Sequence, residues 1–302
     1  LNLTEDHFDR YDGMADYAMD ELQGKTPLEY AKTPNMDFLA KHGLVGLVQT
    51  IPDKLPPGSD VGNLSVLGYN PENFFSGRAP LEAANLNIKL KKDEIAFRCN
   101  LVTVNNDKMI DYSAGHITSG EAALLIDALN KNNKMRNIKF YAGKSYRHLL
   151  IIKSPNAKEI ALSACTPPHD ILNQDIRSFL PRGVHRKTLI DLMEWSRGIL
   201  ENHSVNKKRV SAKKDPANMI WLWGQGQKPQ LPLFKKKFGV EGSVISAVDL
   251  VNGIGKLVGL KIINVPNATG YYDTNYKGKA QYALKSLKKA DFVFIHIEAP
   301  DE

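Results

Sequence analysis

The hydrophobic and polar positions along this chain predict an α/β fold. Short, continuous apolar runs are typical of buried strands, and they occur at 44–51, 219–224, 242–248, 260–265 and 291–297. Apolar residues at helical spacing follow or precede these runs at 34–42, 249–259 and 278–290. Short strands that alternate with helices are typical of a parallel sheet. We therefore expect a mostly parallel sheet sandwiched by helices.

The helix at 34–42 has the clearest ends. Thr33 is a favourable N-cap, Pro34 suits the first helical position, and Gly43 suits the position after the last turn. The apolar run 44–51 then predicts a buried strand, which leads into the loop "LPPGSD". Strand, loop and helix thus follow one another in this part of the chain.

The middle of the chain has an α+β pattern. Two apolar segments, 94–104 and 108–112, flank Asn105-Asn106-Asp107 and predict a hairpin. Further elements are expected near 119–131, 138–142, 147–153 and 186–203, and the polar stretch 202–218 has the composition of a linker. We expect an inserted α+β domain at 88–212, between two parts of one α/β domain at 1–87 and 213–302.

Composition narrows the class of protein. The chain has 302 residues, of which 42% are apolar and 24% charged, as in ordinary soluble proteins. No apolar run approaches the roughly 20 residues of a membrane-spanning helix, so we expect no membrane partner. Cys99 and Cys165 are the only cysteines, which excludes a disulfide scaffold and favours a cytoplasmic location.

The net charge of +7 allows more than one partner. A basic protein can bind nucleic acid or a small anionic substrate. The lysines are scattered in short groups, as in "NKKRVSAKK" and "LFKKKFG", without the aromatic residues that single-strand binders interleave with them. We interpret them as solvated surfaces and expect no nucleic-acid partner. The sequence does not indicate an oligomeric state.

The loop before the segment "VGNLSVLG" holds a first candidate for chemistry, Ser59. Ser59 and Asp60 are both favourable N-caps, so a structural role is one interpretation. A helix N-terminus also presents N–H groups and positive potential to a phosphate. A serine needs a base or a metal to become a nucleophile, and no histidine lies in the loop. Cap and nucleophile both remain open on these residues alone.

Three further groups of residues have chemical potential. Asp12 precedes a glycine, as a metal ligand in a loop or an ordinary turn residue does. Acidic residues follow the last apolar run, and they suit a divalent metal or form a solvated chain end: Glu298, Asp301 and Glu302. Arginine and histidine side chains of the middle segment suit a clamp on an anionic ligand, although each alone is typical of a surface: Arg98, His116, Arg147, His169 and, beside it, Asp170.

Ten motifs in order resemble one family. The segment "TPNMDFLAKHG" is similar to a pattern of the alkaline phosphatase superfamily. Within that superfamily, the following segments resemble those of the cofactor-independent phosphoglycerate mutases of the archaeal type: "PGSDVGNLSVLGYNP", "GRAPLEAA", "FRCNLVTV", "DYSAGHI", "SYRHLL", "PPHD", "NMIWLWGQGQKPQLP", "VISAVDLVNGIGKLVG", "ATGYYDTNYKGKA" and "HIEAPDE". The resemblance covers nearly the whole chain from Asp12 onward.

The resemblance implies an alkaline-phosphatase-like domain that holds two divalent metals (manganese, zinc or magnesium), with an inserted substrate-clamping domain. It implies interconversion of 3-phosphoglycerate and 2-phosphoglycerate in glycolysis and gluconeogenesis, without bisphosphoglycerate. Ser59 would be the residue phosphorylated during turnover. Asp12 and Ser59 would bind one metal and Asp301 the other. The small phosphorylated substrate would be bound by Arg98, His116, Arg147, His169 and Asp170, with Lys279 near the phosphoryl group.

Two departures from the family change the expected activity. The polar segment "LTEDHFDRY" stands where the family has an apolar strand before Asp12, and in the family further Asp and His metal ligands follow position 302. We therefore expect an incomplete core at the C-terminus and a chain that is inactive or weakly active by itself. The alternatives are a phosphotransferase or phosphatase of the same superfamily acting on another small phosphate, and a non-catalytic remnant that binds or regulates.

Overall fold

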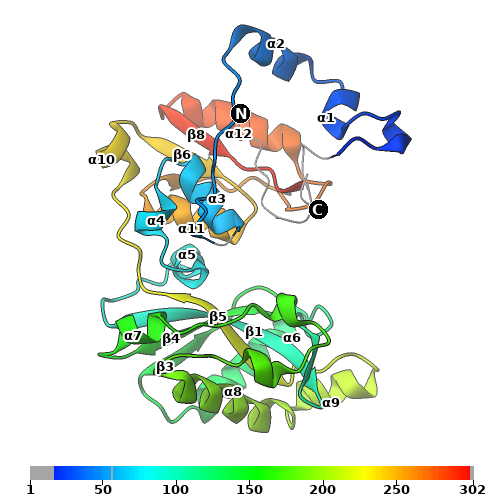
Figure 1. Ribbon diagram of the computed structural model, residues 1–302, viewed down its shortest axis with the longest axis vertical. Coiled ribbons are helices and arrows are strands. Elements are labelled where there is room, and N and C mark those ends of the chain that lie inside the picture. The colour runs from blue at the N-terminus through cyan, green and yellow to red at the C-terminus, as the bar shows by residue number, and fades with distance from the viewer. Residues whose placement is uncertain (1–16, 56, 300–302) are drawn as a thin grey trace. The chain divides into compact units, whose positions relative to one another are not determined.

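The computed structural model of the chain describes residues 17–55 and 57–299. Contacts group these residues into two compact units (Figure 1). The first unit comprises the described residues up to Phe75 and from Gln230 onward, and the second comprises Ser76–Pro229. None of the described helices is long and apolar enough to cross a membrane.

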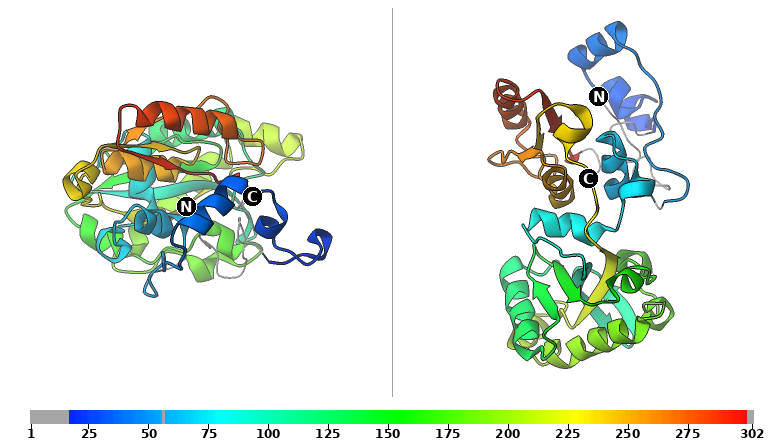
Figure 2. Two further views of the ribbon diagram at one scale, coloured as in Figure 1. Left: turned by 90° about the horizontal axis from the view of Figure 1, so that it is seen from above. Right: turned by 90° about the vertical axis from the view of Figure 1, so that its left-hand side faces the viewer.

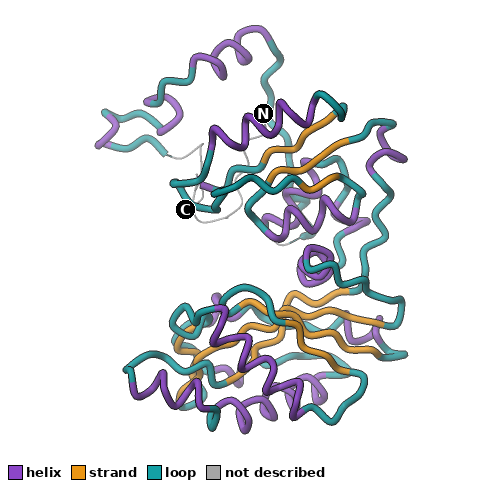
Figure 3. Tube along the Cα trace, turned by 180° about the vertical axis from the view of Figure 1, so that it is seen from behind, coloured by secondary structure: helices purple, strands orange, loops and turns teal. Residues whose placement is uncertain are grey.

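The first unit contains a three-stranded parallel sheet in the order β7-β6-β8. Its strands and their connecting helices are β6 (Gly242–Ile245), α11 (Asp249–Leu257), β7 (Lys261–Ile262), α12 (Tyr276–Leu287) and β8 (Phe292–Ile295). The two helices lie on opposite faces of the sheet (Figures 1 and 3). Because β7 and β8 flank β6 on different sides, the carboxyl ends of β6 and β8 border a topological switch point, where α/β sheets bind ligands.

Short helices complete the first unit: η1 (Asp20–Leu22), α1 (Pro27–Tyr30), α2 (Pro34–His42), α3 (Ser59–Val66), α4 (Pro71–Phe74) and α10 (Phe234–Phe238). Helix α2 confirms the predicted ends, with Thr33 as N-cap, Pro34 first and Gly43 as C-cap. The Thr33 hydroxyl donates to Asp37 Oδ1 at 2.9 Å instead of capping a backbone N–H.

The predicted strand at 44–51 is wrong. The structure has no strand there, and the side chains of Leu44 and Leu47 are fully exposed. A strand needs a partner along its hydrogen-bonding edge, and this segment pairs with none of the described strands. An apolar run shows that a segment can be buried, but it does not identify the partner.

The second unit contains a five-stranded antiparallel sheet. Its strands are β1 (Glu94–Asn105), β2 (Lys108–Asp111), β3 (Ile138–Tyr141), β4 (Arg147–Lys153) and β5 (Met219–Gly226). The predicted hairpin is confirmed, and its turn residues Asn106 and Asp107 have φ of 48° and 57°, as a primed turn requires.

Strand β5 differs from the prediction. The apolar run at 219–224 is a strand, but it pairs antiparallel with β1, where Ile220 lies opposite Leu101, and it does not join the parallel sheet. A fully apolar strand fits either kind of sheet when both faces are covered, so the pattern did not distinguish them. Residues 76–87 and 213–229 therefore group with the middle segment, whereas the sequence placed the boundaries at 88 and 212.

The helices of the second unit cover the two faces of its sheet unequally. They are α5 (Arg78–Asn85), α6 (Ser119–Asn132), α7 (Ala157–Ala161), η2 (Pro168–Ile171), η3 (Ile176–Phe179), α8 (Arg186–Leu200) and α9 (Ser204–Ser211). Helix α8 packs on one face and α5 on the other (Figure 2). The inward side chains of the α8 face form the main core, with Phe97 and Leu101 fully buried. On the α5 face, Ala79 and Ala83 pack near Ala96.

The polar stretch expected to be a linker is structured. Helix α9 lies within it, and Asn206 and Arg209 are buried. The Asn206 amide donates to the carbonyls of Leu200 and Ala217, both at 2.8 Å. Buried polar residues are tolerated when they are hydrogen-bonded, which composition alone does not show.

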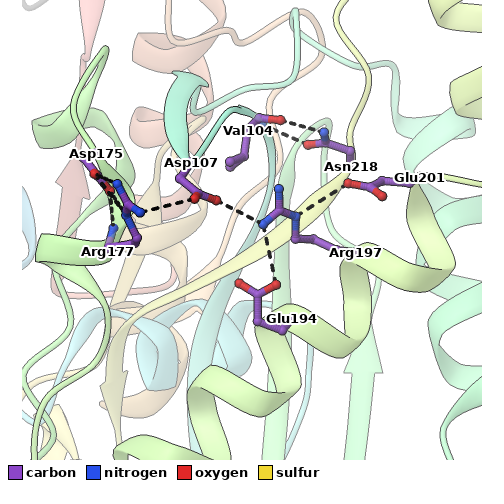
Figure 4. A network of polar contacts seen from close by, with 8 residues as sticks. All are labelled: Val104, Asp107, Asp175, Arg177, Glu194, Arg197, Glu201 and Asn218. Atoms are coloured by element: carbon purple, nitrogen blue, oxygen red, sulfur yellow. Dashed lines mark hydrogen bonds and ion pairs between the residues drawn. The ribbon is translucent and has the colours of Figure 1, made fainter.

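A network of polar contacts fixes the β1–β2 turn (Figure 4). Asp107 forms ion pairs with Arg177 at 3.8 Å and with Arg197 of α8 at 3.5 Å. Asn218 accepts from the Val104 N–H at 2.9 Å and donates to its carbonyl at 2.7 Å. The turn is thereby held to α8, η3 and the start of β5.

Candidate functional site

Ser59 is the first residue of α3, and it does not cap that helix. The N-cap is Gly58, with no side-chain cap hydrogen bond. Asp60 Oδ1 instead accepts from the Val61 N–H at 2.9 Å. Among the described residues, no group forms a hydrogen bond with the Ser59 hydroxyl, and the residue is half-buried. A hydroxyl with no structural partner, beside the N–H groups of a first helical turn, is suited to meet a phosphoryl group.

A second cluster lies in the first unit at the carboxyl ends of β6 and β8. His296 Nδ1 is 3.2 Å from Ser246 Oγ, and His296 Nε2 is 3.2 Å from Glu298 Oε2. The ammonium group of Lys279 donates to the His296 carbonyl at 3.1 Å, and this lysine is 1% exposed. Asn252 is buried nearby, and its Oδ1 has no hydrogen-bond partner among the described residues. The cluster occupies the switch point of the sheet.

Burial sets the charge states in this cluster. Burial and, as the smaller cause, the charge of Lys279 together lower the pKa of His296 to about 4, so the imidazole is neutral near pH 7. Burial also lowers the pKa of Lys279, while the Glu298 carboxylate acts in the opposite direction. A buried ammonium at a ligand-binding edge suits an anionic phosphoryl group.

The predicted metal ligands are only partly within the described chain. Asp12 and Asp301 lie outside the described residues, as does Glu302. Within residues 17–55 and 57–299, no group of three or more His, Cys, Asp or Glu side chains could hold a metal ion. The described part alone does not fit a metal centre, and the metal assignment of Asp12, Ser59 and Asp301 stays a prediction.

In the second unit, Arg98 lies on the α5 face of the sheet. Its side chain is 6% exposed, its Nε is 3.1 Å from Glu82 Oε2, and its guanidinium lies 4.3 Å from the ring centroid of Trp223. The Nε contact lacks hydrogen-bond geometry, so it is an ion pair only. Burial lowers the pKa of Arg98 to about 10, a shift that Glu82 opposes, and the guanidinium remains charged near pH 7.

Aromatic rings connect Arg98 to other predicted residues. His169 is in ring contact with Trp223 at 5.3 Å between centroids and with Tyr112 at 6.0 Å. Tyr112 contacts Tyr146 at 5.6 Å. The guanidinium of Arg147 lies 5.4 Å from the Tyr146 ring centroid. We call Arg98, Arg147, His169 and these three rings the arginine–aromatic cluster.

The remaining predicted clamp residues lie at the edge of this cluster or outside it. Asp170 Oδ1 is 3.6 Å from His169 Nε2, and both side chains are about half exposed. His116 is exposed in the loop after β2, with φ of 48°, and its N–H donates to Ser113 Oγ at 3.1 Å. That hydrogen bond lies within the loop itself, outside the arginine–aromatic cluster. Lys279 belongs to the first unit, in the switch-point cluster.

Several residues of these clusters were not predicted from the sequence. Trp223 looked like a core residue of a parallel strand, and Ser246 and Asn252 had no motif. Glu82 and Arg78 carried a usable signal, because a spacing of four residues is typical of an ion pair on a helix. His296 stood in a quoted motif, but nothing in the pattern indicated its pairing with Ser246.

Comparisons with known proteins agree with the resemblance. The family model for 2,3-bisphosphoglycerate-independent phosphoglycerate mutase matches residues 40–206. A protein of that name from Methanosarcina mazei is 52% identical over 291 residues, which is 96% of this chain and 72% of the relative. The fold is a mixed α/β fold similar to two solved structures. A Pyrococcus horikoshii protein has a TM-score of 0.75 and 30% identity, over 95% of this chain and 68% of its own.

The second solved structure is a cofactor-independent phosphoglycerate mutase from Thermoplasma acidophilum. It has a TM-score of 0.62 and 27% identity, over 95% of this chain and 75% of its own. The name of the matched family implies a small phosphorylated substrate and no requirement for bisphosphoglycerate. The chain belongs to the 2,3-bisphosphoglycerate-independent phosphoglycerate mutases, and it is therefore an isomerase.

Proposed function

We propose that the chain interconverts 3-phosphoglycerate and 2-phosphoglycerate through a phosphoserine at Ser59. The observation that carries this proposal is the position of Ser59, whose hydroxyl has no partner among the described residues at the first turn of α3. A serine committed to capping would hold its hydroxyl against a backbone N–H of its own helix, and this one does not.

The reaction consists of two phosphoryl transfers. In the first, the bond between phosphorus and the 3-oxygen of the substrate breaks as a bond from Ser59 Oγ to phosphorus forms. The hydroxyl proton of Ser59 is lost, and the 3-oxygen of glycerate gains a proton. In the second, the 2-hydroxyl of glycerate loses its proton as a bond from its oxygen to phosphorus forms, the bond from Ser59 Oγ to phosphorus breaks, and Ser59 regains a proton. Atoms and charge balance without bisphosphoglycerate.

The other residues have binding roles. Lys279 is the group for the phosphoryl oxygens, because its buried ammonium lies at the switch point of the first sheet. Arg98, Arg147, His169 and Asp170 bind the glycerate in the second unit, where cationic groups lie against aromatic rings. His116 belongs to this set only through the resemblance. Two divalent metals, with Asp12, Ser59 and Asp301 among their ligands, a cytoplasmic location and an alkaline-phosphatase-like core complete the proposal.

The test is conversion of 3-phosphoglycerate to 2-phosphoglycerate in the absence of bisphosphoglycerate. Ser59→Ala should lower the rate on the order of 10³-fold or more, since a nucleophile has no substitute in its own mechanism. Ser65→Ala is the matched control, because Ser65 is a half-buried serine of the same helix, and it should retain the wild-type rate.

Each other outcome contradicts part of the proposal. A Ser59→Ala protein with full activity would exclude Ser59 as the nucleophile. Release of inorganic phosphate in place of 2-phosphoglycerate would indicate a phosphatase, and substrate binding without turnover would indicate a non-catalytic protein.

A further inference from the structure

We propose that Glu82 joins Arg78 and Arg98 into one paired guanidinium site, and that Arg78 is a further substrate-binding residue that holds the glycerate carboxylate. The inference rests on the proposed function, because it assigns a part of phosphoglycerate to a part of the second unit. Arg78 is the new member: neither the arginine–aromatic cluster nor the predicted clamp includes it.

The bridge is formed by the two oxygens of one carboxylate. Arg78 Nε donates to Glu82 Oε1 at 3.3 Å, and Arg98 Nε lies 3.1 Å from Glu82 Oε2. Arg78 and Glu82 are four residues apart on α5, whereas Arg98 comes from β1. Glu82 therefore holds guanidinium groups from two elements near one another. Each directs its Nε toward Glu82, and among the described residues the terminal nitrogens of the two arginines form no hydrogen bond.

The stems of the two arginines converge over one glycine. A Cβ atom built on Gly224 would lie 3.5 Å from Arg78 Cβ and 3.6 Å from Arg98 Cγ and Cδ. Gly224 has φ of +57°, so its backbone conformation also favours glycine. Trp223, the preceding residue, stacks on the Arg98 guanidinium. Gly224 of β5 thus lies beside the stems of both arginines, and Trp223 lies against the Arg98 guanidinium.

Around Arg98, the positive charges are not balanced by the Glu82 carboxylate. Glu82 and, to a smaller extent, Tyr146 stabilise the charged Arg98, while Arg78 and Arg147 both act on it as like charges. Three cations therefore share one carboxylate among the charges that act on Arg98. A buried pair with a structural role would be neutral, because an uncompensated buried charge is unfavourable. An excess of guanidinium at a nine-tenths buried arginine is suited to an incoming anion.

The carboxylate is the anion that we assign to the pair. The phosphoryl group leaves for Ser59 in the proposed reaction, whereas the carboxylate is common to both isomers and stays with the glycerate throughout. A planar guanidinium fork matches a carboxylate with two parallel hydrogen bonds. D-glycerate carries the carboxylate without the phosphate, and inorganic phosphate represents the phosphoryl group without the carboxylate. Inhibition by the two probes therefore reports on the binding of each group by itself.

The experiment measures the 3-phosphoglycerate KM and the inhibition constants of D-glycerate and inorganic phosphate. Arg78→Gln should raise KM and the D-glycerate constant about 10- to 100-fold, the loss of one charged hydrogen-bonding partner, and leave the phosphate constant within twofold. Arg78→Lys, which keeps the charge but not the fork, should recover only part of the loss. Arg186→Gln removes an exposed positive charge elsewhere in the second unit and should have no effect.

Glu82→Gln distinguishes a positioning role of Glu82 from a purely electrostatic one, because the two roles predict opposite changes in D-glycerate affinity. Removal of a negative charge beside an anion site would by itself tighten D-glycerate binding. If Glu82 positions the pair, binding weakens at least about threefold instead, which is below the loss expected for Arg78→Gln. Tryptophan fluorescence checks that each variant is folded, because Trp195, Trp221 and Trp223 all lie in the second unit.

The inference and the proposed function fail in different ways. Wild-type protein that neither converts 3-phosphoglycerate nor binds D-glycerate contradicts the proposed function. Wild-type protein that does both, with Arg78→Gln unchanged or altered only toward phosphate, overturns the inference alone. A Glu82→Gln protein that binds D-glycerate more tightly overturns the positioning role.

Discussion

The buried side chain of His148 should make the stability of the second unit depend on pH. It lies in β4 opposite Cys99, is 2% exposed, and its Nδ1 accepts from the Gly143 N–H at 3.0 Å. Its Nε2 has no partner among the described residues. Burial lowers the pKa of His148 to about 3, whereas an unfolded histidine titrates near 6.5. The folded state therefore disfavours the charged imidazole.

The direction and the magnitude of this pH effect on stability follow from the difference in bound protons between the folded and unfolded states. Above pH 6.5 the imidazole is neutral in both states, and the contribution to stability is fully present. Between 6.5 and 3 the unfolded chain binds one proton more than the folded chain, so stability falls as the pH falls by about 1.36 kcal/mol per unit. From pH 7.5 to 4.5 this one group removes about 2.7 kcal/mol.

The assay is urea unfolding followed by tryptophan fluorescence at pH 7.5 and 4.5. All three tryptophans lie in the second unit, so the signal reports the unit that contains His148. His148→Asn removes the titrating group and keeps an oxygen near the position of Nδ1. The wild type should lose about 2–3 kcal/mol more than the variant between the two pH values. Other titrating groups are common to both proteins and cancel. Equal losses of stability in the wild type and in His148→Asn would show that the folded state does not lower the pKa of His148.

Two other predictions concern Arg209 and the metals. Arg209 is 3% exposed and donates to the carbonyls of Ala114 and Asp215 and to Glu121 Oε2. Because Arg209→Met leaves these acceptors unpaired, it should destabilise the second unit by about 3 kcal/mol in urea unfolding. A loss under about 1 kcal/mol would contradict a structural role of these hydrogen bonds. Chelation should abolish conversion of 3-phosphoglycerate and manganese should restore it, whereas a chelated, metal-free protein with full activity would exclude the metal assignment.

Local patterns predicted much of the fold where short-range physics decides it. The ends of α2 follow from the conformational preferences of Thr33, Pro34 and Gly43, and the β1–β2 turn follows from two residues that tolerate positive φ. These features depend on neighbours in the chain. They need no knowledge of what packs against them.

Pairing over long distances in the chain was harder to predict. The run at 44–51 is as apolar as a strand but has no strand partner among the described residues, and β5 pairs antiparallel with a strand about 120 residues earlier. Helix α9 looked like a linker because its buried residues are polar, and their hydrogen bonds appear only in three dimensions.

For the candidate site too, the sequence indicated single residues but not the contacts between them. Motifs indicated Arg98, Arg147 and His169 as polar residues worth attention, and the structure connects them through aromatic rings. The partners Glu82 and Trp223 could not be assigned from spacing alone, because they reach Arg98 from other elements of the fold. For Ser59, the sequence left cap and nucleophile open, and the structure places Gly58 at the cap.

The proposed phosphoserine at Ser59 is tested most directly by determining the covalent state of Ser59 during turnover. The chain is mixed with 3-phosphoglycerate, quenched in acid within the first turnovers, digested and analysed by mass spectrometry. We predict one phosphoryl group on Ser59 that appears with substrate and is absent in Ser59→Ala. Conversion to 2-phosphoglycerate at the full rate, with no phosphate on Ser59 at any time, would contradict it.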